Sequence, residues 1–359
     1  MRVGIARYPY FQQNLKGGDY ILFDGIKEAL EEEYTVEFIE YRRPGAFVLS
    51  FLPRPPAKLA VWLIDLCLPF VFSRQLLGQL DRYDLILGDS AVLTRIPGWS
   101  SRNKRLIALI NIDYHEYLGS VGKHLPLRPR LIMRWKSWMQ ERGLMTYPSV
   151  AVSGFVAETA RRRGVCIGRI VENQIQGLPD TPGPADLATC PKGLVYAGSG
   201  DYWGKGLDTL EALASKGMEI HTYSPGRPAG CINHGAVARD TLLRTLPAYH
   251  AMIFPSRYES FGLIAIEAMA MGIPVIMRPT GIGLDLMKKI PECVVPSQPS
   301  DGDWEDAIRA VSLDRERIVD QCRKFATSYL DKFRFSANWR NAIGEFMATR
   351  VPDAQLLQR

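Results

Sequence analysis

The sequence predicts an α/β protein made of two domains. Short apolar runs, typical of buried parallel strands, alternate with amphipathic segments that have the period of a helix. A chain of 359 residues is long enough for two cores. Residues 178–192 lie in a stretch rich in Pro and Gly and without periodicity, as a linker should. We therefore expect domains over residues 1–177 and 193–333.

The first domain begins with a buried strand over Val3–Ala6. A loop containing Gly17 and Gly18 follows and leads into an amphipathic helix over about Asp19–Glu31. This strand, glycine loop and helix suit the close approach of a phosphate, but the loop lacks both the dinucleotide glycine pattern and the lysine of an ATP-binding loop. NAD and ATP are thereby disfavoured, and a simple turn remains the alternative.

Further strands are expected in the first domain at Val36–Tyr41, Asp84–Gly88, Leu106–Asn111 and Ser149–Val152. The third of these leads directly into Asp113, His115 and Glu116. Because ligands bind beyond the carboxyl ends of strands in open α/β sheets, these side chains are placed to meet a substrate. The alternative is that they are ordinary surface loop residues.

Residues 42–80 are unusually rich in aromatic and aliphatic side chains with basic flanks (Phe47, Phe51, Trp62, Leu63, Ile64, Leu66, Leu68, Phe70, Val71 and Phe72, beside Arg42, Arg43, Arg54, Lys58 and Arg74). The apolar run at 59–72 is shorter than the ~20 residues that a spanning helix needs. It is either a core helix or an element that lies on an anionic membrane surface; the second interpretation is a hypothesis, in which this element would bring the protein to a lipid-linked acceptor. Downstream, the helical spacing of Arg130, Arg134, Trp135, Trp138 and Arg142 favours a solvated surface with packed aromatics.

The second domain opens with a strand over Gly193–Ala197 and a glycine-rich turn that ends at Lys205 and Gly206. A helix over Leu207–Ser215 comes next. A lysine in a glycine-rich turn at the start of a helix is typical of a diphosphate site, although a solvated lysine is the alternative. A strand over Met218–Ser224 and a helix over Asp240–Leu246 follow.

The most informative stretch is residues 255–275. An apolar strand ends at Phe254, and a helix begins near Gly262 and ends at Gly272. Within this nearly apolar helix Glu267 needs a partner, because an unpaired buried charge is costly. Glu259 lies in the loop before the helix, whose positive end favours an anion. The alternative is that Glu259 is an exposed loop acid and that a structural arginine neutralises Glu267.

On these residues the sequence resembles the family 4 glycosyltransferases, which are retaining enzymes of the GT-B fold with a Glu-x7-Glu signature at the donor site. The signature stands here as Glu259-Ser-Phe-Gly-Leu-Ile-Ala-Ile-Glu267, within the wording PSRYESFG. The resemblance implies two Rossmann-like domains that face a central cleft, the first for the acceptor and the second for the nucleotide-sugar. It also implies that an amphipathic helix within residues 334–359 crosses back onto the first domain.

The resemblance assigns roles to particular residues. Glu267 would bind the ribose, and Glu259 would hold the donor sugar or a cationic partner. Asp113 or His115 would lie near the reacting sugar. The remaining donor-binding residues would be Gly17, Gly18, Lys205, Arg257, Phe261, Gly262 and Leu263. The chain departs from the family pattern at Ser199, where an arginine is usual, and this puts the strength of diphosphate binding in question.

The implied reaction is transfer of a sugar, with retention, from a nucleoside-diphosphate donor to a hydroxyl of a glycan or lipid-linked acceptor in cell-surface glycan synthesis. Lysine and helix amides at the diphosphate would remove the need for a metal or other cofactor. Asp301-Gly-Asp303 superficially resembles a metal-binding motif, but we interpret Asp303 as the cap of a helix over Trp304–Val311. The alternatives are a nucleotide-sugar epimerase and a non-catalytic relative.

Charge and cysteine content narrow the partners and the location. The net charge is +6, with 25 Lys/Arg against 19 Asp/Glu in residues 1–192 and 19 against 19 in the remainder. No nucleic-acid recognition motif accompanies the basic half, so an anionic membrane surface or a phosphate-bearing acceptor suits it better. Six scattered cysteines and the lack of a signal-peptide pattern favour a cytoplasmic protein, peripheral on the inner face of the membrane, without structural zinc.

Overall fold

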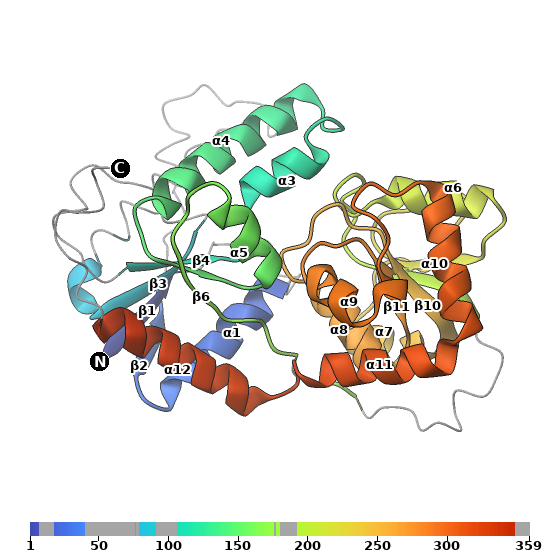
Figure 1. Ribbon diagram of the computed structural model, residues 1–359. Helices are drawn as coiled ribbons and strands as arrows, with labels where there is room; N and C mark the ends of the chain where they lie inside the picture. Colours follow the sequence, from blue (N-terminus) through green and yellow to red (C-terminus); the bar gives the residue numbers. More distant parts are fainter. Residues whose placement is uncertain are drawn as a thin grey trace.

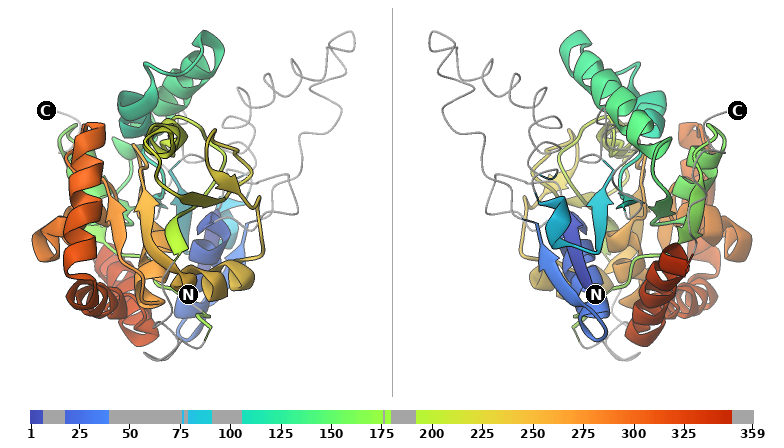
Figure 2. Two further views of the ribbon diagram at one scale, coloured as in Figure 1. Left: turned by 90° about the vertical axis from the view of Figure 1, so that its right-hand side faces the viewer. Right: turned by 90° about the vertical axis from the view of Figure 1, so that its left-hand side faces the viewer.

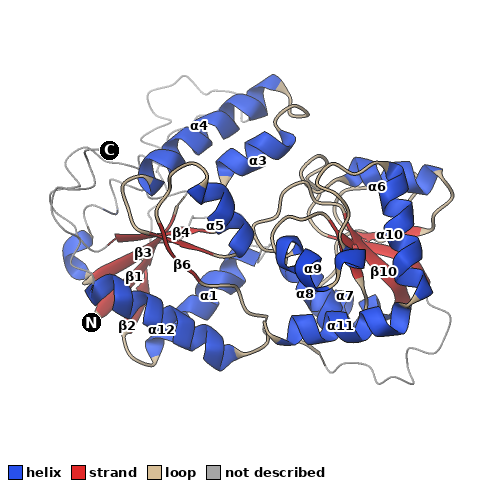
Figure 3. Cartoon of the chain, viewed as in Figure 1, coloured by secondary structure: helices blue, strands red, loops and turns tan. Residues whose placement is uncertain are grey.

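The computed structural model describes residues 1–6, 18–39, 76, 79–90, 106–175, 177–179 and 192–348. Within this part of the chain there are two parallel β-sheets, each flanked by helices (Figures 1 and 3). One sheet is built from strands before residue 171 and the other from strands after residue 191. The predicted α/β class is confirmed.

The first sheet has six strands in the order β2-β1-β3-β4-β5-β6. Its strands are β1 (Arg2–Ala6), β2 (Thr35–Phe38), β3 (Leu85–Asp89), β4 (Leu106–Ile110), β5 (Ser149–Ala151) and β6 (Ile167–Ile170). The helices of this domain are α1 (Gly18–Glu31), α3 (Tyr114–Val121), α4 (Leu127–Leu144) and α5 (Gly154–Arg161). The interior strands β3 and β4 are buried along their whole length, as parallel strands covered on both faces are.

The second sheet has five strands in the order β11-β10-β7-β8-β9. They are β7 (Lys192–Ala197), β8 (Ile220–Tyr223), β9 (Ile232–Asn233), β10 (Tyr249–Phe254) and β11 (Val275–Met277). Its helices are α6 (Leu207–Ser215), α7 (Arg239–Thr245), α8 (Leu263–Ala270), α9 (Gly283–Lys289), α10 (Asp301–Leu313) and α11 (Arg315–Thr327). Since all the strand pairs are parallel, the loops that follow β7, β10 and β11 emerge at one edge of the sheet.

The last described helix, α12 (Lys332–Ala348), packs against the first domain beside α1 (Figure 1). Its buried face includes Trp339, which is fully covered. On its solvent side Lys332 forms an ion pair with Glu28, and Arg340 forms one with Glu33 at 3.4 Å.

The start of α10 differs from the sequence prediction. The helix begins at Asp301, and Ser300 is its N-cap. Asp303 occupies the third helical position, where its carboxylate accepts a hydrogen bond from the Ser300 amide at 2.7 Å. The hydrogen bond from the Ser300 hydroxyl, at 2.6 Å, and the bond from the Ser300 amide lower the pKa of Asp303. Asp303 therefore belongs to a capping box, and Ser300 is the residue that caps.

Two sequence predictions fall largely outside the described residues. Gly17 is not among them, whereas Gly18 is the first residue of α1. Of residues 42–80, only 76, 79 and 80 are described. None of the described helices combines the length and the apolar composition needed to cross a bilayer.

Candidate functional site

Three loops of the second domain converge at the carboxyl edge of its sheet. The amide of Arg257, after β10, donates to the carbonyl of Gly204, after β7, at 2.9 Å. The amide of Ile282, after β11, donates to the carbonyl of Phe261 at 2.9 Å. The loop that carries Glu259 therefore lies between the other two, at the edge where parallel α/β sheets bind ligands.

Two glycines shape the backbone at this edge. Gly262 precedes α8 with a φ of 102°, and Gly206 precedes α6 with a φ of 70°. Both values lie in the left-handed region that side chains rarely adopt. A Cβ at position 206 would also lie 2.4 Å from the carbonyl oxygen of Pro255. The helix of Glu267 thus starts on bare backbone, and its first amides have no intrahelical acceptor.

Lys205 and Glu259 come together at this edge as an ion pair. Their side chains are 24% and 11% exposed, so the pair is screened from water but still reached by it. The two residues belong to different loops, 54 positions apart. Lys205 and Glu259 were each predicted to bind the donor, on separate sequence motifs. In the structure they are direct neighbours.

Glu267 is nearly buried in α8 and is paired with Arg239 of α7. Its oxygen Oε1 accepts hydrogen bonds from Nε of Arg239 at 2.8 Å and from Nη2 at 2.6 Å. Burial raises the pKa of Glu267, and the charge of Arg239 opposes that rise. Nη1 of Arg239 also donates to the carbonyl of Gly177 at 3.1 Å. This is the pairing that the alternative interpretation of Glu267 expected.

Sequence reasoning missed Arg239 as a residue of this site. The signal available was the buried glutamate itself, which requires a cation. The arginine lies 28 residues earlier, on a different helix, and several arginines of the second domain could have supplied the charge. Only the ion pair between α7 and α8 in the folded protein identifies it.

Arg257 is held by its own domain. It forms two hydrogen bonds of 2.7 Å with the carboxylate of Asp208 and one of 3.0 Å with the carbonyl of Trp203. A neighbouring arginine, Arg278, is buried and donates to the carbonyls of Pro255 and Ser297. Burial first, and the charge of Arg257 next, lower the pKa of Arg278 to about 10. A donor-binding role for Arg257 stays a prediction and would require it to exchange partners.

The loop of Glu259 also contacts the first domain. The hydroxyl of Tyr258 accepts a hydrogen bond from the amide of Asp113 at 2.6 Å, and Ser153 donates to the carbonyl of Ser260 at 2.5 Å. Burial raises the pKa of the Tyr258 hydroxyl well above its ordinary value, so it stays protonated. The starts of α3 and α5 are therefore hydrogen-bonded to the loop that precedes α8.

A second set of contacts joins α3 and the loop after it to residues 201–203. Tyr117 donates to the carboxylate of Asp201 at 3.0 Å. Burial first, and then the charge of Asp201 and this hydrogen bond, raise the pKa of the tyrosine. The ring of His124 stacks on Trp203 with 4.5 Å between the centroids.

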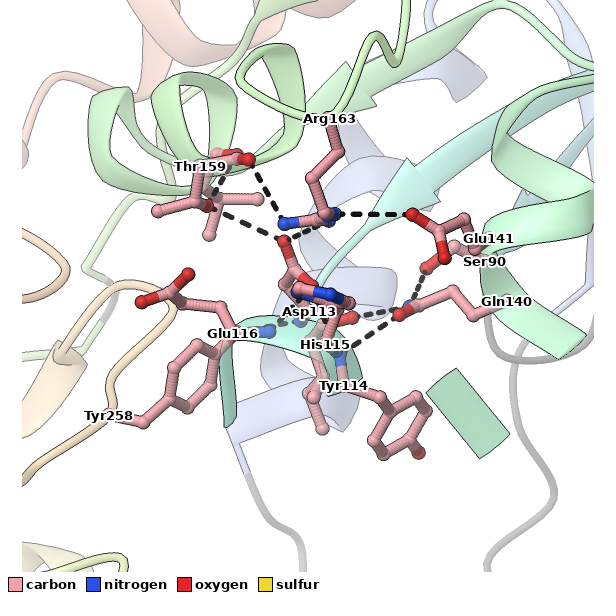
Figure 4. A network of polar contacts seen from close by, with 12 residues as sticks. Ser90, Asp113, Tyr114, His115, Glu116, Gln140, Glu141, Thr159, Arg163 and Tyr258 are labelled. Carbon is pink, nitrogen blue, oxygen red and sulfur yellow. Dashed lines mark hydrogen bonds and ion pairs between the residues drawn. The ribbon is translucent and has the colours of Figure 1, made fainter. Parts of the chain in front are cut away.

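Asp113 is fully buried and caps α3 (Figure 4). Its Oδ1 accepts hydrogen bonds from the amides of His115 and Glu116 at 3.1 Å each. Its Oδ2 accepts one from Arg163 at 2.7 Å. These bonds engage both oxygens, which favours a structural role for Asp113. Of the two predicted residues beside the reacting sugar, His115 is the exposed one.

The same network fixes α4 to α3 through Gln140 (Figure 4). Its Oε1 accepts a hydrogen bond from the amide of Tyr114 at 2.9 Å, while its Nε2 donates to Ser90 and to the carbonyl of Ile112. Gln140 was not singled out from the sequence, where it is one polar residue among many. Its role depends on its position in the fold: it is buried in α4, beside the ends of β3 and β4.

Ser199 lies in the loop after β7, at the position where an arginine was expected from the family pattern. Its carbonyl accepts hydrogen bonds from the hydroxyls of Tyr196 and Ser224, at 3.2 Å each. Neutral hydroxyl groups thus hold the backbone of this loop at Ser199. Lys205 is the cation of this turn that pairs with Glu259.

The second domain is similar in sequence to known glycosyltransferases. Residues 236–346, which include Arg239, Glu259 and Glu267, match a model of the family 4 glycosyltransferases found in conflict systems. An uncharacterized glycosyltransferase of Methanocaldococcus jannaschii is 33% identical over 36% of this chain and 31% of its own length. A D-inositol 3-phosphate glycosyltransferase of Saccharomonospora viridis is 36% identical over 41% of this chain and 32% of its own. The alignments thus span about a third of these curated relatives.

Solved structures match almost the whole chain. Sucrose-phosphate synthase from Thermosynechococcus elongatus has a TM-score of 0.70 at 19% identity, over 97% of this chain and 99% of its own. WaaG, a glycosyltransferase of lipopolysaccharide biosynthesis, has 0.64 at 14%, over 97% and 100%. HepE of Anabaena, solved in complex with UDP and glucose, has 0.58 at 13%, over 96% and 99%. These likenesses confirm the predicted fold.

Proposed function

Because this chain has the GT-B fold and resembles the family 4 glycosyltransferases, we propose that it transfers a sugar, with retention, from a nucleoside-diphosphate donor to a hydroxyl acceptor. The observation that carries the proposal is the meeting of Lys205, Glu259 and the start of α8 at one sheet edge, with Glu267 buried in the same helix.

Lys205 and the first amides of α8 suit the diphosphate. Negative charge develops on that group as the glycosidic bond breaks, and donors fixed in advance stabilise it most effectively in a partly dry site. In the structure Lys205 is held by Glu259, so its amine is already positioned at the loop. A bound diphosphate would share Lys205 and leave Glu259 available to the hydroxyls of the donor sugar.

Glu267 can bind a ribose without losing Arg239. Both hydrogen bonds from Arg239 go to Oε1. Among the described residues no hydrogen bond uses Oε2, which can therefore accept a ribose hydroxyl. Arg239 would keep the carboxylate charged and oriented, which makes it a positioning residue for the donor.

His115 is the group that we place near the acceptor, since it is exposed in the first turn of α3 while Asp113 holds that turn in place. WaaG is described as acting in lipopolysaccharide biosynthesis, and the putative transferase WcaC of Escherichia coli, 31% identical over 34% of this chain, as acting in colanic acid biosynthesis. These names support a glycan acceptor. That the acceptor is lipid-linked, and that a cytoplasmic enzyme reaches it at a membrane surface, is part of our proposal and rests on the composition of residues 42–80.

A donor screen tests the proposal. The purified chain is incubated with UDP-, GDP- and dTDP-sugars, UDP first because HepE was solved with UDP, and nucleotide release is measured. We expect release with one donor class, lowered about a hundredfold in Lys205→Ala and strongly in Glu267→Ala. Lys324→Ala, an exposed lysine of α11 that also pairs with an acid, is the matched control. Equal release by all four proteins would refute the assignment.

Ser199 favours a second candidate, a non-catalytic relative that has lost donor affinity. Thermal unfolding with UDP and with GDP separates the two: a chain stabilised by neither nucleotide lacks a working donor site. Conversion of a nucleotide-sugar to an isomer without any acceptor would instead identify an epimerase.

A further inference from the structure

One face of α4 is anchored in the first domain. Its buried side chains are Ser137, Met139, Gln140 and Leu144, together with Gly143. Gln140 holds the start of α3 and the end of β4 through the three hydrogen bonds described above. In both views of Figure 2, α3 and α4 stand at the upper end of the molecule. These contacts attach α4 to the first domain through one face and leave its opposite face toward solvent.

That opposite face carries large apolar side chains in solvent. Leu127, Leu131, Trp138 and Met145 are 68%, 54%, 44% and 53% exposed. The last three are spaced by seven residues, and Leu127 lies one turn before Leu131, so the four form one stripe. At about 100° per residue this stripe lies opposite Gln140. A surface helix normally shows polar residues there, so the stripe indicates a contact surface.

Arginines line both sides of the stripe. Arg128, Arg134 and Arg142 are all exposed and lie within about 60° of Leu131 on the helix. The guanidinium of Arg142 lies 4.3 Å from the ring centroid of Trp138. The one acidic residue of the helix, Glu141, points to Arg163 at 3.5 Å. The exposed face is therefore basic as well as apolar.

We propose that this α4 surface (Leu127, Arg128, Leu131, Arg134, Trp138, Arg142 and Met145) docks on an anionic lipid bilayer. Apolar side chains can enter the boundary between headgroups and acyl chains, while arginines on both sides contact the phosphates. Tryptophan prefers this boundary. Basic residues on both flanks of a straight stripe match a planar anionic surface, and the excess of positive charge in residues 1–192 adds to the attraction.

The docking does not require the proposed reaction, but it has a consequence for it. Because Gln140 ties α4 to the first turn of α3, a docked α4 would hold His115 at a fixed distance from the bilayer. An acceptor carried on a lipid would then meet the site from the membrane side. This consequence rests on the proposed function, whereas the docking can be measured with neither donor nor acceptor present.

Vesicle sedimentation of the full chain tests the docking. Vesicles of phosphatidylcholine alone are compared with vesicles that also contain phosphatidylglycerol, at low and at high salt. We expect binding only to the anionic vesicles and mainly at low salt. Arg128→Gln/Arg134→Gln/Arg142→Gln should weaken that binding by about a hundredfold, and Leu131→Gln by about tenfold.

Matched variants of the second domain serve as controls. Lys288→Gln/Arg309→Gln/Lys324→Gln removes three exposed cations, and Leu313→Gln removes an apolar side chain that is 82% exposed. Both controls should bind like the unmodified chain. Leu131 is half exposed, so its variant should keep the native unfolding temperature. If the α4 variants sediment like the controls, or if neutral vesicles bind equally well, the proposal is wrong.

Discussion

Glu267 carries its charge inside a nearly apolar helix, and Arg239 is the residue that makes this tolerable. Replacing Arg239 by Gln leaves a buried carboxylate without its cation, which should lower the free energy of unfolding by about 2 kcal/mol at neutral pH. This is less than the loss expected on breaking a fully buried ion pair, because the Arg239 side chain is 31% exposed. Urea unfolding of the two proteins measures this loss. Glu267→Gln/Arg239→Gln, which removes the charge on both sides, should recover part of it.

The pH dependence of that loss follows from the pKa of Glu267. Burial already raises it above 4.5, so the folded state binds the proton more tightly than the unfolded chain, and stability falls as the pH rises from 4.5 through the raised value. Without Arg239 the pKa rises further. The Arg239→Gln protein should therefore match the unmodified chain near pH 4 and fall behind toward pH 7. An equal deficit at both pH values would contradict this account.

At the level of elements, Gly262 sets where α8 begins. A Cβ there would meet no atom closer than 3.6 Å, so the penalty of Gly262→Ala comes from its φ of 102° rather than from a clash. We expect about 1–2 kcal/mol of destabilisation together with a lower rate of the proposed sugar transfer, because the amides at the start of α8 would shift.

Gly235→Ala is the matched control for that substitution. Gly235 has a φ of 77° in a loop where a Cβ meets nothing within 4 Å. The Gly235→Ala protein should lose about as much stability as Gly262→Ala, measured by urea unfolding, and keep its activity. If both variants lose activity equally, the backbone at Gly262 has no special role in the site.

Elements with strong local signals could be predicted from the sequence. Helix α6 has the predicted limits, because it lies between glycine breaks and its apolar residues have a clear helical period. β6 and β9 were missed, since both are edge strands with polar or half-exposed residues. The loop acids were found in the same way, through glycine and proline at fixed offsets.

The partners of those acids could not be predicted. Arg239, Arg163 and Tyr258 act through contacts with residues 28, 50 and 145 positions away along the chain. Each is an ordinary residue in its local sequence. Local patterns identify a strand end or a helix start, but which side chains meet there depends on how helices pack on two different sheets.

At the scale of the whole molecule, a buried hydrogen bond from the amide of Asp113 to the hydroxyl of Tyr258 joins the start of α3 to the loop that carries Glu259. Tyr258→Phe removes only that hydroxyl. A buried hydrogen bond contributes about 1 kcal/mol, so its loss should shift the balance between joined and separated domains about fivefold toward separation. Small-angle scattering should then show a larger radius of gyration, and acceptor turnover should fall by a similar factor.

Tyr249→Phe is the control that separates this effect from simple loss of a buried hydroxyl. Tyr249 is fully buried at the start of β10, and its hydroxyl bonds to that of Tyr223 at 2.9 Å within the same domain. Its variant should lose comparable stability without any change in the radius of gyration, because both hydroxyls of that bond belong to the second domain. Since Lys205 and Glu259 are unchanged in both variants, the affinity for the proposed donor should stay the same. Equal scattering and equal turnover for the two variants would mean that Tyr258 does not link the two domains.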